Sequence, residues 1–138
     1  MLLIHKTYCM QQTNQNKEFL IRYFNALSGV TKTREILEEY ITDQELIEHI
    51  LFFDTVFPKY ELFADEITAE GNRVVVKARL TGVHEGDFNG IPPTYKKVDF
   101  PCVVSYDIEN GKIVHYWLMA DQALMMEQLG VMNVPAGE

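Results

Sequence analysis

The sequence predicts an α+β fold in which helices come first and one antiparallel sheet follows. As far as Phe57, apolar residues recur at the i, i+3, i+4 spacing of amphipathic helices. From Tyr60 onward, apolar and polar residues alternate in four segments separated by short turns. Strands that follow one another without an intervening helix pair antiparallel. This order of elements is typical of the α+β class.

Length and composition indicate one globular domain. At 138 residues, with 47% hydrophobic and 12% aromatic residues, the chain can bury a sizeable core. Twelve basic and twenty acidic residues give a net charge of −8, which argues against nucleic acid and anionic membranes as partners. No apolar run reaches the length of a membrane span. Cys9 and Cys102 lack Cys-x-x-Cys spacing, so we expect two free thiols and a cytoplasmic location.

The domain is expected to span residues 13–132. Residues 1–12 show no hydrophobic period and are expected to form an N-terminal tail that is loose or packs on a partner. Residues 133–138 are expected to form a C-terminal tail. No repeat, linker or low-complexity segment divides the region between the two tails.

Three helices are expected before the sheet. The first begins near residue 14 and ends at Gly29, with an apolar row at Leu20, Tyr23, Phe24 and Leu27. A shorter helix is expected over 31–40. The third is expected over 43–57, because the segment 42–45 reads as a capping box with a threonine N-cap, and the proline at 58 ends it.

The sheet is expected to contain four strands followed by a short helix over 121–129. The strands are expected over 60–69, 73–84, 96–108 and 112–120. Glycine turns join the first pair and the last pair, and Asn110-Gly111 is a strong hairpin signal. Pro101 requires an edge position or a bulge, so the third strand is expected to bend.

Two titratable side chains end strand faces that are expected to point inward. His84 follows the apolar even positions of the second strand. Asp121 follows the odd positions of the fourth strand, Ile113, His115, Trp117 and Met119. A carboxylate there must be paired, protonated or open to a cavity, and strands that end together around a pocket commonly build an acid–base site. Two alternatives stay open: Asp121 as the N-cap of the last helix, and His84 as a structural histidine of the following loop.

Other candidates have equally plain alternatives. His49 borders the apolar stripe of the third helix, as a rim residue or as part of a pocket. The loop over 85–95 carries two glycines and Pro92-Pro93, which suits a lid over a cavity or a crossing loop that buries Phe88 and Ile91. No metal-binding histidine spacing, phosphate loop or dinucleotide motif occurs, so we expect no cofactor.

A combined motif then resembles a known family. The matching positions are Gly82, His84, Gly86, Phe88, Gly90, Ile91, Pro92, Pro93, Thr94, Asn110, Gly111, Lys112, Ile113, Trp117, Asp121, Gln128, Leu129 and Gly130. Over about residues 15–132 the sequence is similar to the SnoaL-like polyketide cyclases of the nuclear-transport-factor-2-like superfold. Two positions depart from that pattern, since Tyr95 replaces a glycine and His115 stands where glutamate is common.

The resemblance implies a cone, formed by a curved antiparallel sheet wrapped around the N-terminal helices (cystatin-like), with an apolar pocket. It implies Asp121 as the acid–base residue, with His84 polarising a carbonyl or protonating an alkoxide. It also implies a homodimer. The substrate-binding side chains expected with this reading are His49, Phe53, Phe88, Ile91, Phe100, Tyr106, Trp117 and Met119. Core packing is the alternative for Trp117 and Met119.

The expected function is cofactor-free acid–base catalysis on an apolar carbonyl compound, by aldol-type ring closure or isomerisation in the lyase or isomerase class. With water beside Asp121, the same residues would serve an epoxide hydrolase-like enzyme. A small-molecule-binding module without chemistry is the second hypothesis. A protein that pairs through the outer sheet face is the third.

Overall fold

The computed structural model describes residues 2–132, and side chains from residue 10 onward. The α+β class is confirmed. The elements are α1 (Leu2–Leu27), α2 (Arg34–Glu38), α3 (Gln44–Val56), β1 (Glu61–Glu70), β2 (Arg73–Val83), β3 (Lys97–Glu109), β4 (Lys112–Ala120) and α4 (Gln122–Gln128). No helix in this described range is long and apolar enough to cross a membrane.

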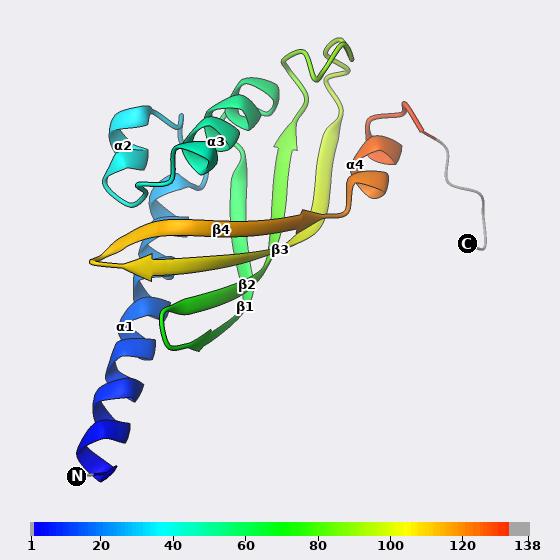
Figure 1. Cartoon of the computed structure of the whole chain (residues 1–138). Coiled ribbons are helices and arrows are strands. Elements are labelled where there is room, and N and C mark those ends of the chain that lie inside the picture. Colours follow the sequence, from blue (N-terminus) through cyan, green and yellow to red (C-terminus); the bar gives the residue numbers. More distant parts are fainter. Residues whose placement is uncertain (1, 133–138) are drawn as a thin grey trace, which may run out of the picture.

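The four strands form one antiparallel sheet in the order β1-β2-β3-β4. The sheet curves around α1 and α3, and α4 follows at the end of β4 (Figure 1). Apolar residues of α1, α2 and α3 share one core cluster with the inward positions of β2, β3 and β4. Helices therefore cover the concave face, which gives the expected cone.

Residues 2–12, which were expected to form an N-terminal tail without regular structure, are helical and belong to α1. The expected domain boundary itself stays a prediction. An apolar period reports which helical positions are buried, not whether a segment is helical. Among the described side chains of α1, which begin at residue 10, burial begins at Phe19, so residues 10–18 carry no such period. The tail expected over 133–138 lies outside the described residues, as does the side chain of Cys9. Cys102 is a free, buried thiol.

The start of α3 differs from the expected capping box by one residue. Asp43 is the N-cap, and its carboxylate accepts hydrogen bonds from the N–H groups of Glu45 and Leu46. Thr42 cannot take this place because its N–H and hydroxyl both donate to the carbonyl of Ile113. The chain stays extended against β4 until Asp43.

Burial alternates along β2 and β3 as expected, but not along β4. Between Ile113 and His115 the register with β3 shifts by one residue, leaving Val114 as a β-bulge. One extra residue exchanges the two faces of a strand. The inward side chains beyond the bulge are Tyr116, Leu118 and Ala120, and the exposed ones are His115, Trp117 and Met119. The inward parity expected for β4 is therefore right at Ile113 and wrong after it.

Pro101 lies at the point where β3 loses one neighbour. The last pair between β3 and β4 is Cys102 with Ala120, so Pro101 pairs only with Arg79 of β2. The expectation of an edge position is confirmed. The carbonyl of Pro101 accepts a hydrogen bond from the N–H of Asp121, which sets the start of α4.

Candidate functional site

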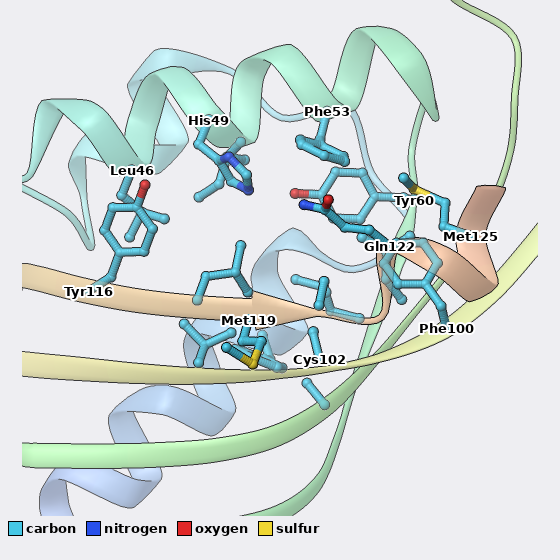
Figure 2. Close-up of a pocket in the computed structure, with 18 of the residues that line it drawn as sticks. Leu46, His49, Phe53, Tyr60, Phe100, Cys102, Tyr116, Met119, Gln122 and Met125 are labelled. Atoms are coloured by element: carbon cyan, nitrogen blue, oxygen red, sulfur yellow. The ribbon is translucent and has the colours of Figure 1, made fainter. Parts of the chain in front are cut away.

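A cavity of about 350 Å³ lies between the helices and the concave face of the sheet (Figure 2). Most of its lining is apolar or aromatic. Its polar groups come from His49 of α3, from four tyrosines, from Cys102 and from Gln122. Such a cavity suits an apolar ligand that is oriented by a few polar contacts.

Six of the eight expected substrate-binding residues line this cavity. They are His49, Phe53, Phe88, Phe100, Tyr106 and Met119. Met119 belongs to the rim, since it is 63% exposed. Trp117 lies on the outer face of the sheet because of the bulge, and it is 54% exposed. Ile91 packs beside Phe88 in a second apolar cluster, outside the cavity lining.

His84 is fully buried and does not line the cavity. Its Nδ1 accepts a hydrogen bond from the N–H of Thr94 at 3.1 Å and lies 3.0 Å from the Thr94 hydroxyl. Its backbone bonds to Tyr95 and Lys96. The ring therefore holds the two ends of the loop over 85–95 together. This corresponds to the alternative in which His84 is a structural histidine of that loop. A catalytic role for His84 stays a prediction.

That loop is docked on the C-terminal end of α3. The N–H groups of Glu85 and Gly86 donate to the carbonyl of Val56 at 3.0 and 3.1 Å. A Cβ at Gly86 would lie 1.9 Å from the carbonyl oxygen of Thr55, so only glycine fits there. Phe88 is the loop residue that reaches the cavity wall. The structure thus shows the loop as a fixed wall beside the cavity.

Asp121 is the N-cap of α4. Its Oδ1 accepts a hydrogen bond from the N–H of Leu124 at 3.0 Å, and the residue is exposed. Its neighbours Ala120 and Gln122 line the cavity, whereas Asp121 does not. The expectation of a pocket-facing carboxylate rested on the β4 parity that the bulge reverses. Its acid–base role stays a prediction that requires the side chain to leave the cap.

His49 is the titratable histidine that the structure places on the cavity wall. It is half-buried, with its ring centroid 4.7 Å from that of Phe53 and 6.3 Å from that of Tyr116. Burial lowers the pKa of His49, and the negative charge of Glu45 partly opposes this effect. The neutral imidazole is therefore favoured near neutral pH. The hydroxyl of Tyr116 donates to Glu45 at 3.3 Å.

Sequence reasoning missed Tyr60 and Gln122, which project toward the same space as His49 (Figure 2). Gln122 is the first residue of α4, next to the residue that drew attention as a base. Tyr60 follows the proline turn after α3, and in the sequence an aromatic ring at that position looks like an ordinary core residue. The signal that would have found them is a polar side-chain atom on an otherwise apolar segment.

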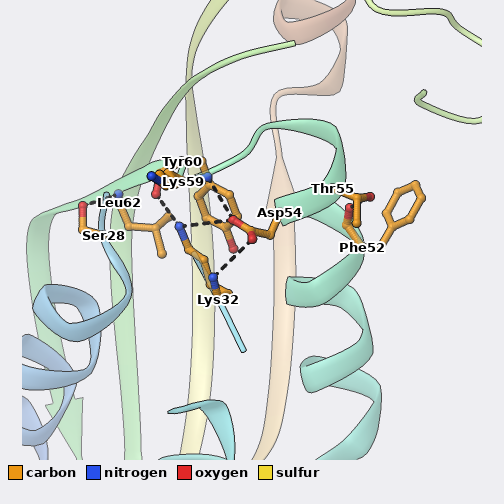
Figure 3. Close-up of polar contacts among 8 residues, drawn as sticks. All are labelled: Ser28, Lys32, Phe52, Asp54, Thr55, Lys59, Tyr60 and Leu62. Carbon is orange, nitrogen blue, oxygen red and sulfur yellow. Dashed lines mark hydrogen bonds and ion pairs between the residues drawn. The ribbon is translucent and has the colours of Figure 1, made fainter. Parts of the chain in front are cut away.

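Tyr60 is held from behind by a buried lysine (Figure 3). The Nζ of Lys32 donates to the backbone carbonyl of Tyr60 at 2.6 Å and lies 3.8 Å from the centroid of its ring. It is also 3.7 Å from Oδ1 of Asp54, which accepts from the N–H of Lys59. Burial lowers the pKa of Lys32 to about 8, and Asp54 opposes this effect. These contacts fix the Tyr60 ring against the cavity.

The family model for the SnoaL-like polyketide cyclases matches residues 31–129. The chain belongs to this family. No curated protein matched the sequence. The chain resembles the solved structure of a candidate SnoaL-like polyketide cyclase from Jannaschia sp. CCS1, with 26% identity, a TM-score of 0.75, and 88% of this chain and 95% of that one covered.

Two further solved structures share the SnoaL-like fold. AclR, a candidate hydroxylase from Streptomyces galilaeus, has a TM-score of 0.77 at 21% identity, with 90% of this chain and 87% of that one covered. IdmH, a candidate polyketide cyclase from Streptomyces antibioticus, has a TM-score of 0.71 at 21% identity, with 85% and 99% covered. At these identities the likeness shows the fold alone.

The two departures from the SnoaL-like pattern both lie away from the cavity. Tyr95 is 70% exposed and adopts a φ of 59°, a left-handed conformation that suits the glycine usual at this position. His115 is exposed on the outer sheet face beyond the bulge. Neither lines the cavity. In the described range, no group of three His, Cys, Asp or Glu side chains could hold a metal ion.

Proposed function

We propose that this SnoaL-like chain is a cofactor-free enzyme that transfers protons on an apolar carbonyl compound, in ring closure or isomerisation. The observation that carries the proposal is His49, an imidazole kept neutral by burial on the wall of an aromatic cavity. Among the described residues nothing hydrogen-bonds its ring nitrogens, so a lone pair is available to a ligand.

The free thiol of Cys102 fits a reducing, cytoplasmic location.

The chemistry follows from the groups on the wall. The neutral imidazole of His49 takes a proton from the carbon next to the substrate carbonyl, and the C–H electron pair moves to form an enolate. The hydroxyl of Tyr60 is a donor for the enolate oxygen, and the amide of Gln122 is a further polar group of the lining, nearer the solvent. In ring closure the enolate carbon attacks a second carbonyl, and the alkoxide formed takes the proton back from the imidazolium of His49. In isomerisation the same imidazolium returns the proton to a different carbon of the delocalised enolate. The apolar wall limits competing water.

Deuterium exchange into 1-tetralone, followed by NMR, tests this proposal. The protein should accelerate exchange of the α-hydrogens, and His49→Gln should lower that acceleration by roughly 100-fold or more. His115→Gln is the matched control, because that histidine is exposed on the outer face. The rate should rise with pH through a pKa below 6.5 and then stay level, since His49 must be neutral. Full activity in His49→Gln would refute its role.

Asp121→Asn separates the two candidate bases. Asparagine caps a helix about as well as aspartate, so this variant removes the charge and keeps α4. Loss of exchange in Asp121→Asn, with exchange retained in His49→Gln, would assign the base to Asp121. The same proton transfer would then require Asp121 to leave its hydrogen bond with Leu124.

Binding without chemistry is the second candidate function. It is favoured by the positions of Asp121 and His84, which both lie outside the cavity lining. It predicts that 1-tetralone binds to the wild-type protein while its α-hydrogens exchange no faster than in buffer.

We also propose that two copies of the chain pair through the outer face of the sheet. Val103 lies beside Met119 there, and Ser105 beside Trp117. Val103, Met119 and Trp117 are 38%, 63% and 54% exposed, which is unusual for large apolar side chains on one contiguous face. A second copy of the same face would cover all of them.

A further inference from the structure

Three tyrosines from distant parts of the chain form the inner wall of the cavity. Tyr23 comes from α1, Tyr60 from the segment before β1, and Tyr106 from β3. Their exposed fractions are only 1%, 4% and 4%. They differ in this respect from Tyr116 and Gln122, which lie nearer the solvent.

The hydroxyls of these three tyrosines have no hydrogen-bond partner among the described residues. In the described part of the chain, His84 Nε2 is the one fully enclosed side-chain nitrogen or oxygen that lacks a partner. Each tyrosine hydroxyl must therefore touch open space, and the open space that these tyrosines line is the cavity. The hydroxyl of a tyrosine this deeply buried normally has a hydrogen-bond partner, in the protein or in a bound molecule.

The inner wall remains uncharged over the physiological range. Burial raises the pKa of Tyr23 and Tyr106 well above the ordinary value, and Tyr60 adds to the rise in both. Burial also raises the pKa of Tyr60 and brings that of the Cys102 thiol to about 11. Because each phenol stays protonated, each can donate a hydrogen bond to a ligand.

Lys32 supports the wall from outside the cavity. Its ammonium group lies 3.8 Å from the centroid of the Tyr60 ring and donates to the backbone carbonyl of Tyr60. The carboxylate of Asp54 lies 3.7 Å from the same ammonium group, so the pair adds no net charge behind the wall. The polar groups of the inner wall are therefore neutral hydroxyl donors, which suit an oxygen acceptor.

We propose that the hydroxyls of Tyr23, Tyr60 and Tyr106 form one subsite that binds a carbonyl oxygen on an otherwise apolar ligand. This subsite fixes which end of the ligand enters first and so determines specificity. The proposal rests on the proposed function in one respect, namely that this oxygen belongs to the carbonyl that reacts. The binding itself requires no catalysis.

A matched pair of probes tests the subsite. 1-Tetralone and tetralin differ only in a carbonyl that replaces a methylene group, and their affinities can be compared by isothermal titration calorimetry. Tyr23→Phe, Tyr60→Phe and Tyr106→Phe each keep the ring and remove the hydroxyl. Each should weaken 1-tetralone binding by about 3- to 10-fold, as expected for one hydrogen bond, and leave tetralin binding unchanged. The triple variant should bind the two probes equally.

Tyr40→Phe is the matched control. Its ring lies 5.6 Å from that of Tyr23, but Tyr40 is outside the cavity lining. The variant should keep the preference for 1-tetralone. A general packing effect would instead change both probes alike.

The subsite is overturned if the wild-type protein binds both probes equally, if it binds neither, or if the phenylalanine variants keep the ketone preference. Failure of the proposed function has a different signature. In that case the wild-type protein prefers 1-tetralone and loses this preference in the phenylalanine variants, while its α-hydrogens exchange no faster than in buffer.

Discussion

Replacing Lys32 with methionine measures the effect of holding a buried cation behind the cavity wall. The side chain of Lys32 is fully buried, between the Asp54 carboxylate and the Tyr60 ring. Methionine has a similar length and no charge. Asp54 keeps its hydrogen bonds from the backbone N–H groups of Lys32 and Lys59 in the variant.

The magnitude follows from the pKa of Lys32. Burial lowers this pKa from 10.5 to about 8 in the folded protein. Between these values the unfolded chain holds more protons than the folded one, so the free energy of unfolding rises with pH. At about 1.4 kcal/mol per pH unit the whole interval amounts to about 3 kcal/mol. About 2 kcal/mol of this falls between pH 8 and pH 10.

Urea unfolding of both proteins between pH 8 and pH 10 provides the assay. Wild-type stability should rise by about 2 kcal/mol relative to Lys32→Met, because other titrating groups cancel in the difference. At a single pH the difference combines the relief of the buried lysine with the loss of its contacts to Asp54 and the Tyr60 carbonyl, so the trend with pH is the test. Lys77→Met, on the exposed face of β2, is the control and should show no such trend. A difference that does not change with pH would refute the reasoning.

Three more substitutions test other features of the fold. Gly86→Ala should lower the free energy of unfolding by 1–3 kcal/mol or more, about the cost of overpacking, because its Cβ would meet the Thr55 carbonyl at 1.9 Å; unchanged urea stability would contradict the docked loop. Asp121→Ala should cost about 1 kcal/mol in the same assay by removing the cap on Leu124, whereas equal stability of the two proteins would argue against that cap. Trp117→Arg should convert a dimer into a monomer in light scattering, and a monomeric wild type would exclude the proposed pairing.

Much of the fold could be predicted from the sequence because its patterns are local. The alternation in β2 and β3 and the Asn110-Gly111 turn each specify a structure within a few residues. The bulge at Val114 could not be predicted, because valine in a strand looks the same whether or not it is paired. The choice of cap at Asp43 depended on a contact with Ile113, far along the chain.

The candidate site was predicted less well than the fold, for a related reason. His49 and Tyr106 were placed correctly because each borders an apolar row of its own element. Tyr23 and Tyr60 read as ordinary core residues, since the rings are apolar and only the unpaired hydroxyls distinguish them. Whether a hydroxyl finds a partner depends on elements far apart in the sequence.

The bulge at Val114 places one residue of β4 outside the ladder with β3. Deletion of that residue would leave His115 and Tyr116 opposite the β3 residues with which they pair now, so the cavity would keep Tyr116 and Leu118. Closing the bulge without a deletion would have the opposite effect. If Val114 entered the ladder, the second half of β4 would turn over as a unit and present His115 and Trp117 to the cavity. The conformation of one valine, and not the length of the strand, therefore determines which face of β4 lines the cavity.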